Sequence, residues 1–423
     1  MSEKIVEECD GLPLAIAILG RTLRNKGKRF WDVVNQQLRK SRYGGMSSVI
    51  DKIKLSYDFL ETSETKLCFL LCALFPEDHK VTMDALVGYA MGENLLGEVE
   101  TLSEARENLH IMVETLVSSG LLLKGEDDDY VMMHDIVPDT AISIARENRN
   151  ESIISVRSLM EIPDGFFKGM KCLATLDLSD IGIKYLPQSL SCLENCLRTL
   201  YLDYYTKLLD ISLIGNLKAL KILSLDGTEI PRLPQEISGL TNLMMLDLSY
   251  NQNLKCIPPK VILSLSSLEV SYMIGSFRGW KIEGSGDNAS LAEVASLTNL
   301  TSLYLSIEHA KWLSTDIGKC HHWEKLENFY VRVGYSFKFE IANSERCVSL
   351  KTRSDSYPVA AWVNVLMGRT YYLRLEWCEG LKNVLQLNPK DLTPMEDTKT
   401  LELLLPSEKV TSCPPRMPFL GGT

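Results

Sequence analysis

A short leucine pattern recurs along the middle of the sequence at a nearly constant interval. The pattern LxxLxL begins at residues 173, 197, 220 and 243, so that successive copies start 24, 23 and 23 residues apart. Each copy supplies leucines that point to the same side of a short strand. Such a unit cannot bury its leucines alone, and the interval therefore predicts that consecutive copies stack on one another.

A second pattern recurs between the copies and keeps the same phase. The segments IKYLPQSLSCL, IPRLPQEISGL and LKCIPPKVILSL each place a proline turn and inward-pointing apolar residues after a predicted strand. Because the strand pattern and the connecting pattern agree, we identify a leucine-rich repeat with a convex connection in each copy. Looser copies begin at residues 300, 326 and 371, and the glycine-rich stretch 275–288 is predicted to be an inserted loop.

Before the repeats, apolar residues recur at helical spacing. One stripe contains Leu12, Ile16, Leu19 and Leu23, and a serine, Ser63, stands where it would cap a later helix. Helices are predicted at 63–75, 82–91, 103–119 and 136–146, and short strands at 121–124 and 130–132. Helices followed by a small hairpin are typical of a winged-helix unit.

These patterns predict an α+β protein with a repeat solenoid, in which a helical and winged-helix segment precedes a leucine-rich-repeat horseshoe. The expected boundaries are a helical part at 1–60, a winged-helix part at 61–150, repeats at 151–405 and an irregular tail at 406–423. The tail offers no capping repeat for the last apolar face, which indicates a chain cut short or a poorly ordered end.

Charge and apolar content narrow the choice of partners and compartment. The net charge is −10 and the isoelectric point is about 5.3, which disfavours nucleic acid as a partner. The N-terminus does not resemble a signal peptide, and no apolar run reaches the roughly 20 residues of a membrane span, so we expect a cytoplasmic protein.

The eleven cysteines are scattered without CxxC spacing and are expected to be free thiols in a reducing compartment. Cys68 and Cys72, like Cys192 and Cys196, are expected to pack in the core. The cluster at 320–322, CHH, lacks a spaced second pair of ligands, so no metal is expected.

Three motifs in the first part of the chain resemble those of a known family. The sequence GLPLA stands at 11–15, CFLLCALFPED at 68–78 and MHD at 133–135, in this order and ahead of the repeats. They are similar to the motifs of the nucleotide-binding (NB-ARC) leucine-rich-repeat disease-resistance proteins of plants, and their wording is closest to the coiled-coil subclass. The resemblance covers nearly the whole chain.

The resemblance implies an ADP/ATP-binding switch and assigns roles to two residues. Pro13 would lie beside the adenine, and His134 would contact the β-phosphate of ADP. A phosphate in front of the following helix would also be favoured by the helix N-terminus. Judged from the residues alone, a helix–helix turn for the first motif and a capping pair for the last are favoured, and the resemblance reverses this preference for His134. Pro138 stands where the family commonly has arginine, so one charged contact would be missing.

The sequence contains no phosphate-binding GxxxxGK[ST] motif, which in the family lies upstream of GLPLA. The chain is therefore expected to be truncated before GLPLA. One charge-assisted hydrogen bond contributes roughly 1.5–3 kcal/mol, whereas micromolar binding needs about 8 kcal/mol. We therefore expect that this chain alone neither binds ADP or ATP tightly nor acts as an enzyme.

The function that these features imply is that of an immune receptor whose repeats sense a pathogen effector or a guarded host protein. Self-association with full-length receptors is a further expectation. The predicted partner-binding residues lie between the leucines of the strands, and several are acidic, which suits a basic partner. They are Asp177, Ser179, Tyr201, Asp203, Ser224, Asp226, Asp247 and Ser249.

Three other functions were weighed. The chain could be a nucleotide-independent interaction module, or a decoy for full-length receptors. It could read nucleic acid through the winged helix, but the acidic run at 126–129 would meet phosphate with carboxylates. An ATPase would require residues that this sequence does not contain.

Overall fold

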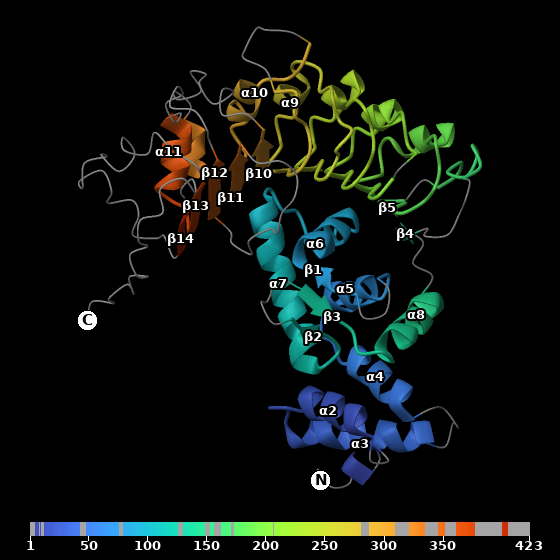
Figure 1. Cartoon of the computed structure of the whole chain (residues 1–423). Helices are drawn as coiled ribbons and strands as arrows, with labels where there is room; N and C mark the ends of the chain where they lie inside the picture. The colour runs from blue at the N-terminus through green and yellow to red at the C-terminus, as the bar shows by residue number, and fades with distance from the viewer. Residues whose placement is uncertain are drawn as a thin grey trace, which may run out of the picture. The chain divides into compact units, whose positions relative to one another are not determined.

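A computed structural model shows a helical segment followed by parallel strands (Figure 1). It describes residues 5–7, 9, 12–42, 48–75, 79–125, 130–148, 153–155, 162–170, 173–205, 207–280, 287–308, 321–334, 346–351, 361–376 and 400–404. The chain divides into two compact units, Met1–Ser224 with Asn242–Met245 and Leu225–Thr241 with Leu246–Thr423. Within the described part, no helix has the length and apolar character needed to cross a membrane.

The first unit begins with helices that pack through the predicted apolar stripe. Leu19 and Leu23 are buried in one cluster, and Leu12 and Ile16 pack against it from its edge. Proline occupies the first position of α2, where its missing N–H has no cost. The helices are α2 (Pro13–Thr22), α3 (Lys28–Arg42), α4 (Ser48–Asp58), α5 (Ser63–Cys72), α6 (Met83–Gly92), α7 (Leu102–Ser119) and α8 (Val137–Asn148).

The expected cap of α5 was off by one residue. Thr62, not Ser63, is the N-cap: its backbone is extended, and its hydroxyl accepts a 3.1 Å hydrogen bond from the N–H of Thr65. Ser63 is already in the first turn. The two hydroxyl residues are adjacent, and backbone conformation decides between them.

A small antiparallel sheet follows the helices. It has the order β1-β3-β2, with β1 at Val81–Thr82, β2 at Leu123–Lys124 and β3 at Tyr130–Met132. The predicted hairpin is confirmed as β2 and β3, whereas β1 was not predicted because two residues carry no detectable periodicity. Thr82 also caps α6, since its hydroxyl accepts from the N–H of Ala85 at 3.3 Å.

The first repeats pair in parallel and in chain order within this unit. The leucines at 173, 176, 178, 197, 200 and 202 are at most 2% exposed, which confirms the predicted inward side. Convex 3-10 helices connect the strands, as expected. The elements are β4 (Ile153–Ser155), β5 (Thr175–Asp177), η1 (Gln188–Leu193), β6 (Thr199–Tyr201), η2 (Ser212–Asn216) and β7 (Ile222–Ser224).

The second unit continues the repeat with longer strands. The looser copies predicted from the sequence are confirmed as the strands β10, β11 and β13. Two further strands, β9 and β12, were not predicted, because Ser271 and Val348 occupy positions at which the pattern expects leucine. The predicted loop after β9 contains two buried aromatic residues, Phe277 and Trp280, with ring centroids 5.0 Å apart. The elements are η3 (Gln235–Gly239), β8 (Met245–Asp247), α9 (Val261–Ser264), β9 (Val270–Met273), α10 (Leu291–Ala295), β10 (Ser302–Ile307), η6 (His321–Lys325), β11 (Asn328–Val333), β12 (Arg346–Lys351), α11 (Ala361–Met367), β13 (Tyr372–Glu376) and β14 (Thr400–Leu404).

The cysteine expectations were correct for one pair only. Cys68 and Cys72 are buried in α5, and a hydrogen bond with Cys68, together with burial, raises the pKa of Cys72. Cys192 is exposed and Cys196 half-buried, because η1 turns other residues inward. Among the described residues no group of three or more His, Cys, Asp or Glu side chains could hold a metal ion; the side chains at 320–322 are not among them.

Candidate functional site

Helix α6 lies unusually close to the first repeat strands, because two glycines face them. Gly88 and Gly92 are four residues apart and therefore share one face of the helix. A Cβ atom at Gly88 would collide with the hydroxyl of Tyr201, and one at Gly92 with the hydroxyl of Thr175. The helix can occupy this position only without side chains there.

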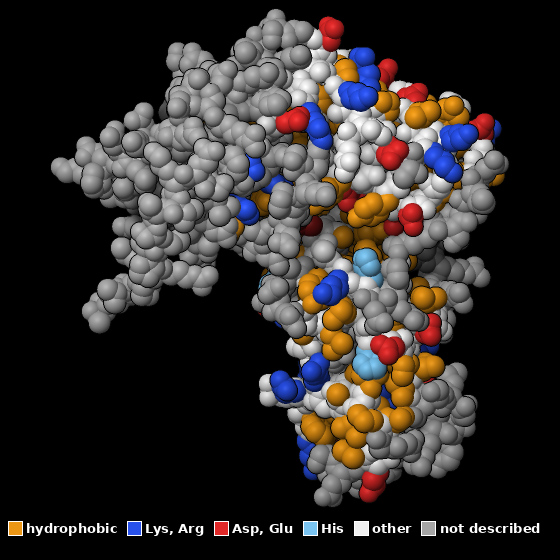
Figure 2. Space-filling model, in the orientation of Figure 1, with side chains coloured by type: hydrophobic (Ala, Val, Ile, Leu, Met, Phe, Trp, Pro, Cys, Tyr) orange, Lys and Arg blue, Asp and Glu red, His pale blue; other side chains and the backbone are white. Residues whose placement is uncertain are grey.

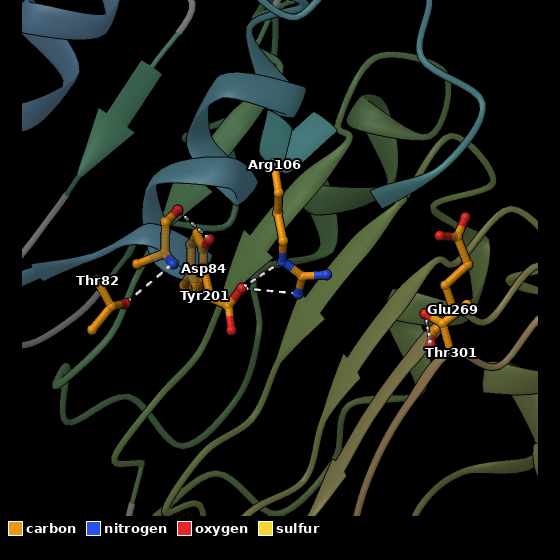
Figure 3. A network of polar contacts seen from close by, with 7 residues as sticks. Thr82, Asp84, Arg106, Tyr201, Glu269 and Thr301 are labelled. Atoms are coloured by element: carbon orange, nitrogen blue, oxygen red, sulfur yellow. Dashed lines mark hydrogen bonds and ion pairs between the residues drawn. The ribbon is translucent and has the colours of Figure 1, made fainter. Parts of the chain in front are cut away.

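Side chains at the start of the repeats hold the backbone of α6. The hydroxyl of Thr199 donates to the carbonyl oxygen of Gly88 at 2.8 Å. The hydroxyl of Tyr201 donates to the carbonyl oxygen of Ala85 at 3.1 Å (Figure 3). Arg198 donates to the carbonyl of Gly92 at 3.0 Å. This last contact places a cation at the C-terminal end of the helix, where the helix dipole favours positive charge.

Tyr89 of α6 is fixed by both polar and aromatic contacts. Its hydroxyl donates to a carboxylate oxygen of the buried Asp177 at 2.7 Å. Its ring stacks on Tyr201, with centroids 5.0 Å apart, and meets Phe75 edge-on at 5.3 Å. One helix turn further, Thr175 donates to Glu93 at 3.2 Å. We call Thr175, Asp177, Arg198, Thr199 and Tyr201 the α6-binding surface.

The position of α6 is transmitted to the other helices of the unit. Arg106 of α7 forms an ion pair with Asp84 of α6 at 2.8 Å, at a half-exposed location (Figure 3). Helix α7 also contacts α2 and α5. A displacement of α6 from the repeats would therefore alter the packing of α7, and through α7 that of α2 and α5.

The predicted partner-binding residues of the first unit divide into two groups. Asp177 and Tyr201 belong to the α6-binding surface and are 3% and 7% exposed, so a partner can reach them only if α6 moves away. The others form a chain of hydrogen bonds: Ser224 donates to Asp203 at 2.6 Å, and the backbone of Asp203 donates to Ser179 at 3.3 Å.

In the second unit, the remaining predicted partner residues lie at strand ends. A carboxylate oxygen of Asp247 accepts from the backbone N–H of Ser249 at 2.7 Å, and Ser249 is buried. Asp226 and Asp247 are half-buried and act on Tyr250: burial first, and then these carboxylates, raise the pKa of that tyrosine. Their role in partner binding stays a prediction.

The two residues assigned to nucleotide binding lie on different elements. Pro13 is exposed at the start of α2, and His134 follows β3 and precedes α8. Helix α4 contacts both α2 and α8. Helix α8 begins at Val137, one residue later than expected, with Pro138 buried in its first turn. The first residue of GLPLA and residues 76–78 lie outside the described residues.

His134 carries an unsatisfied polar atom. Its Nδ1 is buried and has no hydrogen-bond partner in the described structure. A buried ring nitrogen without a partner costs about 1–3 kcal/mol, which a bound phosphate group could offset by hydrogen bonding. The residue thus fits the role implied by the resemblance.

Sequence analysis did not find the α6-binding surface, although one signal was present. The segment MDALVGYAMG is apolar on all sides and contains two glycines, each of which disfavours a helix by about 1 kcal/mol relative to alanine. Glycines at this spacing in a helix indicate close approach by another element. They do not indicate which element that is.

Curated plant proteins are similar to this chain over most of its length. Disease resistance protein At4g27190 of Arabidopsis thaliana is 28% identical over 461 aligned residues, covering 95% of this chain and 46% of that protein. The probable disease resistance proteins At4g27220 and At1g61300 of the same plant are 30% and 26% identical, over 91% and 99% of this chain and 47% and 60% of those proteins. The chain thus spans about half the length of these relatives. No protein-family model matches it.

Solved structures show weaker similarity to this chain. An internalin C2 from Listeria monocytogenes is 17% identical, covers 57% of this chain and 84% of its own, and has a TM-score of 0.35. A leucine-rich-repeat protein of Leptospira interrogans gives a TM-score of 0.30 at 20% identity, covering 58% of this chain and 69% of that one.

Proposed function

Because this chain is homologous to plant disease resistance proteins, we propose that it forms the control portion of a cytoplasmic immune receptor. In this proposal, the first repeats hold a winged-helix segment in its resting position. A pathogen effector or a guarded host protein that binds the repeats then releases it. Helices α5–α7 and the β1-β3-β2 sheet would make up the winged helix.

The observation that carries the proposal is the set of hydrogen bonds between the repeats and α6. Five side-chain hydrogen bonds connect the α6-binding surface to Ala85, Gly88, Tyr89, Gly92 and Glu93. At about 0.5–1.5 kcal/mol each, they stabilise the contact by roughly 3–7 kcal/mol. A partner that binds with nanomolar affinity has about 12 kcal/mol available. Competition for Asp177 and Tyr201 is therefore sufficient to displace α6.

A nucleotide would add a second restraint. The buried Nδ1 of His134 and the exposed Pro13 are the residues that would meet ADP, whose phosphate supplies hydrogen-bond acceptors when it is bound. These two residues alone do not provide the free energy of micromolar binding. We therefore propose that tight binding depends on protein groups beyond this chain.

Exposed isoleucines in the helical segment support such an arrangement. Ile50, Ile136 and Ile142, from α4 and the segment around α8, are 38%, 41% and 37% exposed. Figure 2 shows hydrophobic side chains gathered over the helices around α4. Exposed apolar side chains on these helices suit contact with a further protein segment.

Hydrogen–deuterium exchange of the full chain tests the restraint. Gly88→Val places a side chain against Tyr201, and we expect amides of α6 to exchange at least about tenfold faster, as expected for a loss of about 1.4 kcal/mol. Gly20→Val is the matched control, because a Cβ at Gly20 would meet nothing within 4 Å. Unchanged protection of α6 in the Gly88→Val protein would contradict the proposal.

A titration with a fluorescent ADP analogue tests the second restraint. We expect no saturation below about 100 μM, equivalent to less than about 5.5 kcal/mol of binding. Tight binding that survives His134→Leu would show that neither assigned residue governs the nucleotide. The same experiment distinguishes the nucleotide switch from the nucleotide-independent interaction module. For such a module, His134→Leu would not change the fluorescence titration at any concentration of the analogue.

A further inference from the structure

Tyrosines form a continuous row across the strands of the second unit. Tyr272, Tyr304 and Tyr330 lie directly opposite one another in β9, β10 and β11. Cys347 of β12 continues the row, and Tyr372 of β13 follows it in register. Because the flanking residues Leu303 and Leu305 point into the core, the tyrosine between them points to the opposite face.

A second row, two residues further along the strands, carries positive charge. Ser306, Arg332, Ser349 and Arg374 are neighbours in register on β10 to β13. They share the face of the tyrosine row, since side chains two residues apart point the same way. We call the half-exposed residues Tyr272, Tyr304, Tyr372, Arg332 and Arg374 the tyrosine–arginine surface.

Packing and electrostatics confirm that these residues form one cluster. Tyr330 and Cys347 are buried, and Tyr304 and Tyr372 pack against them from their half-exposed positions. The rings of Tyr272 and Tyr304 are 4.6 Å apart. Burial raises the pKa of Tyr330, while Arg332 and Arg374 oppose that rise, so both cations act at the same ring.

We propose that the tyrosine–arginine surface binds an acidic segment of a partner protein. Tyrosine and arginine are the residues most often found at the energetic centre of protein interfaces. Arginine binds carboxylates through charge-assisted hydrogen bonds, and the tyrosine rings supply apolar contact area. The proposal rests on the proposed role of the repeats in sensing a partner, and it names the chemistry of that partner.

The spacing of the arginines defines the segment further. Adjacent strands lie about 4.8 Å apart, so Arg332 and Arg374, separated by one strand, are about 10 Å apart. The partner therefore carries two carboxylates at this distance. In an extended segment these residues are three apart, and in a helix they are seven apart.

An acidic residue stands on one side of the surface. Asp247 of β8 precedes the tyrosine row and contributes to the raised pKa of Tyr250. Its carboxylate would repel an acidic chain that shifted toward β8. It also disfavours nucleic acid, which needs a continuous path of positive charge.

An unbiased selection tests the proposal. The full chain is panned against a random dodecapeptide library, and the enriched peptides are synthesised and measured by fluorescence anisotropy at about 0.15 M salt, where exposed charges are screened beyond ~8 Å. We expect enriched peptides to carry two acidic residues at the stated spacing. The double variant Arg332→Gln/Arg374→Gln should weaken their binding at least about tenfold, the loss of one or two charge-assisted hydrogen bonds.

Matched variants distinguish the loss of a specific binding site from a general change in charge and from unfolding. Arg232→Gln removes an exposed cation of the second unit that is not part of the tyrosine–arginine surface, and it should leave binding within about twofold, because screened surface charges contribute little. Arg332→Lys keeps the charge but loses the planar fork, so its binding should be intermediate. Circular dichroism with thermal unfolding checks that each variant is folded.

Two outcomes would overturn the proposal. One is the enrichment of neutral or basic peptides, or of acidic ones whose binding ignores both arginines. The other is a single-stranded oligonucleotide that binds the same surface and displaces the selected peptides. Neither outcome affects hydrogen exchange in α6, so failure here is distinct from failure of the proposed restraint.

Discussion

The hydroxyl of Tyr89 in α6 donates a 2.7 Å hydrogen bond to the carboxylate of Asp177 in β5, at a separation of 88 residues in the chain. Asp177 is buried, so removing this donor leaves a charged oxygen without one of its partners. We predict that Tyr89→Phe destabilises the contact by about 1–3 kcal/mol, measured as a lower urea midpoint of the first unit. Tyr185→Phe, at a tyrosine that is 67% exposed, should leave that midpoint unchanged. Equal effects of the two variants would mean that the bond contributes nothing specific.

The N-cap of α5 offers a second test with an adjacent control. Thr62→Ala should lower stability by about 1 kcal/mol, because the N–H of Thr65 loses its acceptor. Ser63→Ala should change it by only a few tenths of a kcal/mol, since Ser63 lies inside the helix and is exposed. Chemical unfolding followed by circular dichroism measures both, and a larger loss for Ser63→Ala would refute the assignment of the cap.

Asn251 is expected to be a critical polar residue of the second unit. It is fully buried, and its side-chain amide donates to the carbonyls of Leu225, Leu248 and Ser249 at 2.7, 3.0 and 3.2 Å. Asn251→Ala should cost about 3 kcal/mol or more, because several buried acceptors lose their donor. Asn242→Ala removes one exposed bond to Lys218 and should cost less than about 1 kcal/mol. Thermal unfolding distinguishes them; similar melting temperatures for both variants would contradict the prediction.

Tyr205 should make the first unit sensitive to alkaline pH. Its hydroxyl is buried without a hydrogen-bond partner in the described structure, and burial, together with the Asp177 carboxylate, raises the pKa of Tyr205 well above its ordinary value. The unfolded chain ionises this tyrosine near pH 10, so its contribution to stability is complete below that pH and falls as the pH rises toward the folded pKa.

The variant Tyr205→Phe tests this assignment. At pH 7 it should be neutral or stabilising by up to about 1 kcal/mol, because no hydrogen bond is lost. Above about pH 10 it should lose less stability than the natural protein. Urea midpoints at both pH values give the comparison, and a destabilised variant at pH 7 would reveal a partner for the hydroxyl.

The repeats could be predicted from the sequence because each copy repeats the same physical requirement. Leu176, Leu200 and Leu223 must all point inward, and the interval between them is fixed by one strand and one convex connection. Where Ser271 or Val348 takes a leucine position, the strand was missed although its geometry is the same. The pattern therefore identified the fold and failed only at individual copies.

The contact between α6 and the repeats could not be predicted in this way. Tyr201 and Ala85 are 116 residues apart, and the hydrogen bond between them depends on the relative placement of two elements that are each regular by themselves. His134 and Pro13 were identified by resemblance, and the structure adds that Nδ1 of His134 is buried and has no hydrogen-bond partner among the described residues. The expectation that Cys192 packs in the core was wrong, because the 3-10 helix has a period of about three and turns Leu190 and Leu193 inward instead.

The two glycines of α6 impose a restriction on how such a repeat array can diversify. Thr175, Thr199 and Tyr201 occupy strand positions that in other copies are free to vary, yet here each must fit against Gly88 or Gly92. A larger residue at any of them would push the helix away, and a smaller one would leave it loose. Under the proposed function, new recognition specificities can therefore arise by substitution in the later strands, while β5 and β6 must keep these side chains to hold α6 in its resting position.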